Sequence, residues 1–226
     1  AGMSAALSSY VAGHLVTLVE ASAQLGGQVL LASTLAKRDR FGLLVSELSE
    51  KVTQSGITLK LNTKISDSSE FLNDFDEVIV ATGANFEARN FGNGVPVIKA
   101  DVAIKELANK NSESNEEIII VDEQGTWIAA SIAEQLANNG FKIHVVSPTA
   151  SLFSQITTYS KLALIPRLKS LGVSMYLASE ITLEGKNCVI TNTLNGEKTE
   201  VPKVLKVVDC GPRLANDALY QQAPLA

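Results

Sequence analysis

The sequence has few of the features that would tie it to nucleic acid, a membrane or a metal. Its net charge is −5 and its lysines and arginines are scattered, so nucleic acid is a poor candidate partner. No apolar run approaches the ~20 residues of a membrane span, and no signal peptide is evident. The two cysteines, Cys188 and Cys210, lie far apart in apolar stretches, and no CxxC motif occurs. We expect no membrane segment, no metal site, two buried unpaired thiols and a cytoplasmic location.

What is present is a regular alternation of helices and strands, in which glycines follow the helices. In the first half, helices are predicted at residues 1–12 and 41–54, and strands at 14–20, 57–62 and 76–83. The last of these, DEVIVATG, is a continuous apolar run, as expected for a strand covered on both faces. A stretch rich in Asn and Gly, residues 84–96, then predicts a connector.

The second half repeats the same order of elements. Helices are predicted at 127–138 and 162–170, and strands at 117–121, 142–147, 173–178, 180–185, 187–193 and 204–211. An internal repeat of this size indicates two homologous α/β units. The predicted fold class is α/β, with two Rossmann-like units of the FAD/NAD(P)-binding type that have parallel sheets flanked by helices. The predicted domains are 1–96, completed by 205–226, and 97–204.

The first unit has the pattern of a dinucleotide site. Such a site needs a strand, a tight glycine turn, a helix whose N-terminus faces the pyrophosphate, and an acid that binds the ribose hydroxyls. Glu20 ends the strand at 14–20, and if Gly2 is the third glycine of GxGxxG, Glu20 lies about 20 residues after the first, where that acid belongs. The alternative is that Glu20 is an ordinary surface acid.

Two further motifs support the nucleotide interpretation. Residues 25–28, LGGQ, place two glycines just after Glu20, where they let the backbone approach a ligand closely. Residues 81–84, ATGA, place a hydroxyl and a glycine at a strand end, and ligands of open α/β sheets lie beyond the carboxyl ends of strands.

These motifs, AGMSAAL, GHLVTLVEASAQLGGQ, GITLKLNT and FDEVIVATGA, resemble a known family. They are similar to the C-terminal nucleotide-binding region of trimethylamine dehydrogenase, dimethylamine dehydrogenase and 2,4-dienoyl-CoA reductase, flavoproteins of the old yellow enzyme group of NADH:flavin oxidoreductases. The resemblance covers nearly the whole chain. It implies a larger parent protein whose N-terminal barrel carries FMN, an iron–sulfur cluster and the substrate site. It also implies that the first strand and first two glycines of the motif precede Ala1.

The resemblance assigns roles to residues of the first unit, which would bind FAD or ADP. Gly2, preceded by Ala1, would lie under the pyrophosphate, and Glu20, followed by Ala21, would bind the adenosine ribose. Other residues would line or close the site: Gly27, Gln28, Ile65, Ala81, Thr82 and Gly83.

The second unit lacks a working nucleotide turn. The turn from Asp122 to Trp127 has one glycine, Gly125, and it stands at the wrong offset. Asp122 and Glu123 would place two carboxylates beside a pyrophosphate. Ser147 stands where a ribose acid is expected. We expect no NADH or NADPH in this unit. Trp127 would either stack on a ligand, or else fill the vacant site or pack on the sheet, and we favour the second interpretation.

No set of catalytic acid, base and nucleophile is visible, so catalytic residues are predicted as none. The main hypothesis is an FAD- or ADP-binding part of a larger flavin oxidoreductase of the amine dehydrogenase type, with its own N-terminal FMN barrel and an electron-transfer flavoprotein as partners. The alternative is a non-catalytic scaffold or interaction domain without nucleotide. Arg213 would either face a phosphate or cap its loop.

Overall fold

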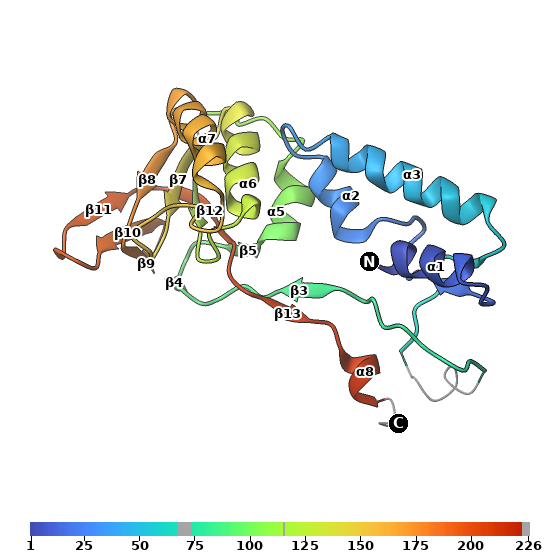
Figure 1. Cartoon of the computed structure of the whole chain (residues 1–226). Coiled ribbons are helices and arrows are strands. Elements are labelled where there is room, and N and C mark those ends of the chain that lie inside the picture. Colours follow the sequence, from blue (N-terminus) through green and yellow to red (C-terminus); the bar gives the residue numbers. More distant parts are fainter. Residues whose placement is uncertain (67–73, 115, 223–226) are drawn as a thin grey trace. The chain divides into compact units, whose positions relative to one another are not determined.

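The chain divides into two units, Ala1–Asn85 with Leu214–Ala226, and Phe86–Arg213 (Figure 1). The structure is a computed structural model that describes residues 1–66, 74–114 and 116–222. The sequence predicted other boundaries, 1–96 with 205–226 and 97–204. Each unit is described separately below.

In the first unit, three helices and two short strands come before residue 61. They are α1 (Gly2–Val11), β1 (Thr17–Val19), α2 (Gly27–Ser33), α3 (Arg40–Gln54) and β2 (Thr58–Lys60). β1 and β2 pair in parallel, as expected for a unit whose strands are joined through helices. A small core of buried side chains holds α1 and α3 on this pair: Ala6, Leu25, Val52 and Ile57.

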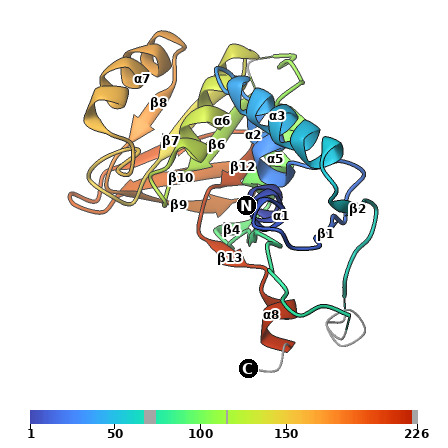
Figure 2. The same ribbon diagram turned by 45° about the vertical axis from the view of Figure 1, so that its right-hand side comes forward.

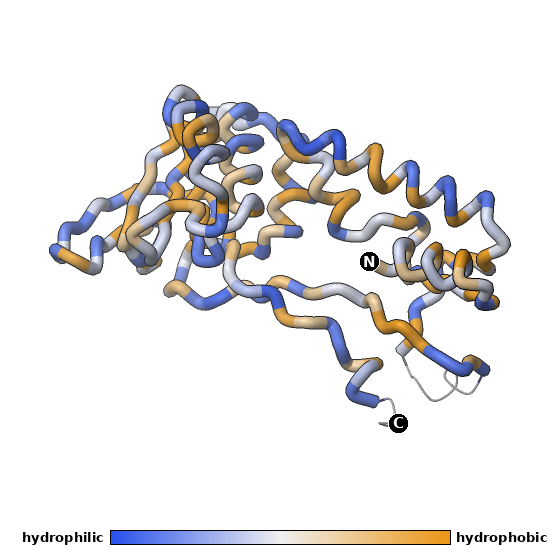
Figure 3. Tube along the Cα trace, in the orientation of Figure 1, coloured by the Kyte–Doolittle hydropathy of each residue, from blue (hydrophilic) through white to orange (hydrophobic). Residues whose placement is uncertain are grey.

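The strand predicted at 76–83 is the clearest error of the sequence analysis. These residues form no strand, and Ile79 is 65% exposed and Val78 40% exposed. Figure 3 shows the stretch as a hydrophobic segment that leads into β3 (Ala84–Phe86). An apolar run becomes a strand only where a neighbouring strand takes up its N–H and C=O groups. In the described part of the first unit, β1 pairs with β2 alone and offers this segment no partner.

The second unit is built on a five-stranded parallel sheet in the order β5-β12-β6-β7-β8. The order of elements along this unit is β4 (Gly92–Asn93), β5 (Val97–Lys99), α5 (Ala100–Leu107), β6 (Glu117–Val121), α6 (Trp127–Asn138), β7 (Lys142–Val146), α7 (Thr158–Ser170), β8 (Ser174–Tyr176), β9 (Ser179–Glu184), β10 (Asn187–Asn192), β11 (Lys198–Val201) and β12 (Val204–Asp209). β6 and β7 are almost wholly buried, which agrees with their continuous apolar sequences.

The helices and an antiparallel meander cover opposite faces of this sheet. Figure 2 shows α6 and α7 on the side of the sheet away from β9 and β10. β9, β10 and β11 pair antiparallel, and β4 joins β9 in parallel. A core of buried side chains lies between sheet and meander: Val95, Ile119, Val121, Val146, Ile181, Leu183, Cys188, Ile190, Val201, Val204 and Val207. The sheet is therefore flanked by helices on one face only.

The last long strand belongs to the second unit. β12 pairs in parallel with β5 and with β6, so residues 204–209 complete this sheet. The sequence analysis had placed residues from 205 onward in the first unit. The return to the first unit begins later, at β13 (Arg213–Ala215), which pairs with β3, and it continues into α8 (Ala218–Gln222).

Candidate functional site

The N-terminus of α1 meets the end of β1 and the segment before β3. Gly2 is the first residue of α1 and Ala1 precedes it as the N-cap. A methyl group built on Gly2 would lie 3.5 Å from Cβ of Ala81 and 3.8 Å from Cδ1 of Leu18. The backbone amides at a helix N-terminus favour negative charge. Here three segments from different parts of the first unit meet at the N-terminus of α1.

Glu20 stands directly after β1 and is held by the adjacent turn. Its backbone N–H donates to the carbonyl oxygen of Lys60 at 2.9 Å, which extends the parallel pairing of β1 and β2 by one residue. Its Oε1 accepts hydrogen bonds from the backbone N–H of Ser22 at 2.8 Å and from the Ser22 hydroxyl at 2.7 Å. A carboxylate has about four acceptor positions, so two bonds at Oε1 leave capacity at Oε2 for a ligand hydroxyl. Ala21 is exposed beside it.

The glycine pair begins α2 and requires glycine for conformational reasons. Gly26 has φ +120° and Gly27 has φ +50°, both in the region that side chains disfavour. A methyl group on Gly26 would lie only 2.6 Å from Cγ1 of Val45 on α3. Gly27 and Gln28 are exposed, and the Gln28 side-chain amide donates to the carbonyl oxygen of Ala84.

Thr82 and Gly83 bind the segment that returns to the first unit. The Thr82 hydroxyl donates to the carbonyl oxygen of Asn216, and the Asn216 N–H donates to the carbonyl oxygen of Gly83 at 2.9 Å. Gly83 has φ +77°. Sequence reasoning did not single out Asn216. Ile65 is half-buried in a stretch without regular structure after β2.

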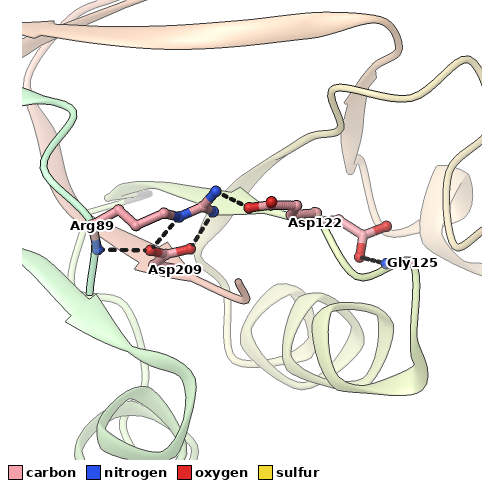
Figure 4. Close-up of polar contacts among 5 residues, drawn as sticks. Arg89, Asp122, Gly125 and Asp209 are labelled. Atoms are coloured by element: carbon pink, nitrogen blue, oxygen red, sulfur yellow. Dashed lines mark hydrogen bonds and ion pairs between the residues drawn. The ribbon is translucent and has the colours of Figure 1, made fainter. Parts of the chain in front are cut away.

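The turn of the second unit is closed by its own carboxylate. Asp122 is 1% exposed, and its Oδ1 accepts from the N–H of Gly125 at 3.0 Å, as Figure 4 shows. Its Oδ2 accepts from the N–H of Phe153, also at 3.0 Å. Burial raises the pKa of the Asp122 carboxyl, and these two hydrogen bonds partly oppose the rise. The sequence had assigned Asp122 only a repulsive effect on a ligand.

Arg89 links the connector to the carboxyl ends of two strands. Its Nε and Nη2 donate to the fully buried carboxylate of Asp209 at 3.0 and 2.6 Å, and its backbone N–H donates to the same group at 2.9 Å. Its Nη1 forms an ion pair with Glu123 (Figure 4). Sequence reasoning missed both Arg89 and Asp209. The only available signal was that Arg89 is the single cationic residue of the predicted connector 84–96.

A cavity of about 290 Å³ opens beside this ion pair. Its walls come from the connector, from the ends of β6 and β7, and from β9: Arg89, Phe91, Val121, Glu123, Val146, Pro148, Ser179, Glu180 and Ile181. Its volume is at the lower limit of sites that hold small ligands, and carboxylates line it. It does not favour a phosphate group.

Trp127 lies partly at the surface, whereas Ser147 is buried. Trp127 is the first residue of α6 and is 37% exposed, so it is not a fully buried filling of the site. Ser147 follows β7, is 1% exposed and bonds Thr149 through their hydroxyls at 3.0 Å. Arg213 lies with its guanidinium 5.7 Å from the centre of the Phe86 ring.

Among the buried titratable groups of the second unit, His144 has a carboxylate partner and the two cysteines are unpaired thiols. His144 is 4% exposed, and its Nε2 lies 2.7 Å from Oε2 of Glu117. Both cysteines are buried and unpaired, as the sequence predicted, and burial raises the pKa of the Cys188 thiol to about 12. Across residues 1–66, 74–114 and 116–222, no group of three or more His, Cys, Asp or Glu side chains could hold a metal ion. Over the same residues, no helix is long and apolar enough to cross a membrane.

Comparison with known proteins identifies the family. The sequence pattern of the pyridine nucleotide-disulphide oxidoreductases matches residues 1–226. The chain belongs to this family. Its members of known fold carry Rossmann-like FAD- and NAD-binding domains, and the α/β class with parallel sheets flanked by helices is thereby confirmed. The family places this chain among flavin- and nucleotide-binding parts of oxidoreductases.

Several proteins of similar sequence or structure are larger than this chain. A probable N-methylproline demethylase of Rhizobium meliloti is 25% identical over 77% of this chain and 25% of its own length. A bilirubin reductase of Mediterraneibacter gnavus is 25% identical over 94% of this chain and 32% of its own length. The structure of histamine dehydrogenase from Rhizobium sp. 4-9 matches 98% of this chain and 36% of its own, with a TM-score of 0.84 and 22% identity. The predicted resemblance to the nucleotide-binding region of such flavoproteins is confirmed. The chain spans about a third or less of these relatives.

Proposed function

We propose that the first unit binds the adenosine diphosphate group of FAD, or ADP itself. The observation that carries this proposal is the position of Glu20 directly after β1, in a unit where the α1 N-terminus at Gly2 lies against Ala81. A parallel strand that ends in an acid, beside a helix N-terminus, supplies the two groups that recognise ribose and pyrophosphate. The exposed Gly27 that follows leaves room for a ligand to approach the backbone.

Each proposed site residue would act through a specific group. Gly2 would contribute its backbone N–H to the pyrophosphate, and the absence of a side chain would let the phosphates approach. Glu20 would accept hydrogen bonds from the ribose hydroxyls. The other residues would shape the site through their backbone: Ala1, Ala21, Gly27, Gln28, Ile65, Ala81, Thr82 and Gly83. Glu20 is the one carboxylate among these residues and its proposed partner is the ribose, so this chain would bind and position a nucleotide.

In this proposal the second unit holds no NADH or NADPH. The N–H of Gly125, which a pyrophosphate would need, already donates to Asp122 at 3.0 Å. Glu123, the next carboxylate, forms an ion pair with Arg89. A dinucleotide would have to displace two internal carboxylates and would itself carry negative charge.

The chain would work within a larger flavoprotein. The sequence resemblance implies an N-terminal barrel of the same polypeptide that carries FMN, an iron–sulfur cluster and the substrate site. It also implies an electron-transfer flavoprotein as the acceptor of electrons. That the relatives are about three to four times as long as the matched region supports this proposal. The substrate would be determined by the barrel.

A scaffold without nucleotide is the second candidate. The observation that favours it is the unpaired segment 76–83, because an apolar stretch that lacks a partner strand leaves the first unit's sheet at two strands. A two-stranded sheet is marginal by itself and supports a ligand site poorly.

Calorimetry with ADP separates the two candidates. We expect Glu20→Ala to weaken ADP binding about ten- to hundredfold, since hydrogen bonds to a charged group contribute roughly 1.5–3 kcal/mol. Glu50→Ala, on the exposed face of α3 in the same unit, is the matched control and should leave the affinity unchanged. Equal affinity of Glu20→Ala and the unaltered chain would remove Glu20 from the site. An unaltered chain that does not bind ADP would favour the scaffold.

A further inference from the structure

The second unit contains a segment, Ser151–Ile156, that lies over its turn and is bonded to it. The segment comes between β7 and α7, at the carboxyl end of β7. Phe153, at the centre of the segment, is fully buried, and Leu152 and Ile156 are buried on either side. A loop segment with three buried apolar side chains is part of the packed structure rather than a solvated connection.

Two hydrogen bonds join the segment to the turn, and a third closes the turn itself. The Phe153 N–H donates to Oδ2 of Asp122 at 3.0 Å, and the Gln155 N–H donates to the carbonyl oxygen of Gly125 at 2.9 Å. The third lies within the turn, where Oδ1 of Asp122 accepts from the Gly125 N–H at 3.0 Å. One carboxylate therefore bonds the turn with one oxygen and the segment with the other.

The contact leaves no space between turn and segment. A methyl group built on Gly125 would lie 2.2 Å from the Ser154 hydroxyl oxygen and 2.6 Å from the Ser154 backbone nitrogen. These separations are shorter than any van der Waals contact, so even one carbon atom cannot enter. A pyrophosphate is much larger. Phe153 adopts φ +51°, a conformation that a bulky residue rarely takes unless surrounding contacts hold it there.

We propose that Asp122 and the segment Ser151–Ile156 together form an internal plug that takes the place of a dinucleotide phosphate in the second unit. The carboxylate of Asp122 supplies the negative charge that the turn amides would receive from a ligand, and the backbone of the segment fills the volume. With the plug in place, the second unit is a packed scaffold in which no dinucleotide phosphate binds. This inference rests on the proposed function, in which this unit holds no nicotinamide nucleotide.

The plug has a carboxylate beside it that serves as a control. Glu123 is adjacent in sequence and carries the same charge, but its partner is Arg89 rather than the segment. Asp122→Asn keeps the size of the side chain and replaces one of its two acceptor oxygens by an amide that cannot accept. Glu123→Gln makes the equivalent change one residue away, so a general effect of removing charge would appear in both variants.

Amide hydrogen exchange of the full chain, resolved by NMR, tests the plug. In Asp122→Asn we expect exchange at Phe153, Gly125 and Gln155 to accelerate at least tenfold, with exchange in β6 and β7 unchanged, and no change in Glu123→Gln. Exchange at Phe153 within twofold of the unaltered chain would overturn the proposal. Should Asp122→Asn fail to fold, Asp122→Glu, which keeps the charge but lengthens the side chain, is measured in the same way with the same expected acceleration.

Inorganic pyrophosphate tests whether the plug replaces a phosphate. Asp122→Gly removes the bond between Oδ2 and the Phe153 N–H, so the segment can move away from the turn. In this variant we expect millimolar pyrophosphate to displace the segment and to shift the amide resonances of Gly125 and Phe153 saturably, with no such shift in the unaltered chain. Asp122→Gly resonances that do not respond, or unaltered resonances that respond equally, would overturn the replacement. These resonances lie in the second unit, whereas the proposed ADP site is tested by Glu20→Ala in the first, so either result can fail without the other.

Discussion

The backbone N–H of Phe153 donates a hydrogen bond of 3.0 Å to Oδ2 of Asp122, 31 residues earlier in the chain. Both residues are almost fully buried. The bond joins the end of β6 to the segment before α7, two regions that form opposite walls of the ligand site in a working dinucleotide unit. The Asp122 carboxylate therefore joins the two walls to each other. The region between them is packed with side chains, although the same strands and helices could form a nucleotide site.

The first prediction concerns Gly125. We expect Gly125→Ala to lower the free energy of unfolding by about 2–4 kcal/mol, because φ is +64° and the added methyl group meets the backbone of Ser154. Gly172→Ala is the matched control. Its φ is +76° but nothing lies within 4 Å of the added carbon, so it should lose about 1 kcal/mol from conformation alone.

Urea denaturation followed by the fluorescence of Trp127 measures both variants, since Trp127 is the one tryptophan of the chain and lies in the second unit. Equal losses for Gly125→Ala and Gly172→Ala would contradict the close contact between turn and segment.

The second prediction concerns Arg89. Its guanidinium is the cationic partner of Asp209, whose side chain is completely buried. We expect Arg89→Met to cost about 2–4 kcal/mol of unfolding free energy, because it leaves a buried carboxylate without its cationic partner. The double variant Arg89→Met with Asp209→Asn should recover part of this loss, since the orphaned charge is then removed.

Arg40→Met, an exposed arginine of α3, is the control and should change stability by less than about 0.5 kcal/mol. A double variant that is less stable than Arg89→Met alone would show that the main cost arises elsewhere.

The repeat of helices and strands could be predicted from the sequence because each element carries its own periodicity. Trp127–Asn138 is helical as predicted, and Glu117–Val121 and Lys142–Val146 are buried strands. Residues 76–83 show the limit of this reasoning. Their composition is that of a buried strand, but strand formation depends on a hydrogen-bonding neighbour, and composition carries no information about that neighbour.

The candidate site was predictable where it depends on sequence spacing and unpredictable where it depends on tertiary contact. Glu20 stands at the end of β1 because the strand length and the glycine pattern are local. Asp122 was recognised as unfavourable to a phosphate, but its bond to Phe153 joins residues far apart in the sequence. The same holds for Arg89 and Asp209, which are separated by 120 positions. No local pattern identifies such pairs.

The third prediction concerns pH and His144. Burial lowers the pKa of His144 below its usual 6.5, and the hydrogen bond to Glu117 only partly opposes this. The unfolded chain therefore binds a proton at His144 more readily than the folded chain does, and stability falls as pH drops through about 6.5. The pKa of Glu117 is lowered, so the stability that this carboxylate contributes is lost only below its usual pKa of 4.5, outside this window.

We expect the unaltered chain to lose more stability between pH 7.5 and 5.5 than His144→Gln does, in urea denaturation at fixed ionic strength. The other polar groups that face this pair are Lys142, which forms an ion pair with Glu117, and the Tyr176 hydroxyl, which lies 3.3 Å from Nδ1 of His144. His14→Gln is the control, because His14 is exposed and lies in the first unit. Parallel pH profiles for the unaltered chain and His144→Gln would contradict the prediction.

The fourth prediction is that the second unit does not bind NADH or NADPH. The test compares the unaltered chain with Glu20→Ala, in which the proposed adenosine site of the first unit is weakened, so that binding of equal affinity in both reports on the second unit. We expect no saturation of NADH fluorescence below about 1 mM, an affinity of roughly 4 kcal/mol, because three features act together. The Gly125 amide is already bonded to Asp122, Ser154 fills the space beside Gly125, and Ser147 bonds Thr149 where a ribose acid would be needed. A ligand would have to break the buried bonds of Asp122 and expose Phe153 before it gained any contact. Saturable micromolar binding that persists in Glu20→Ala and disappears in Trp127→Ala would show that the turn accepts a nicotinamide nucleotide after all.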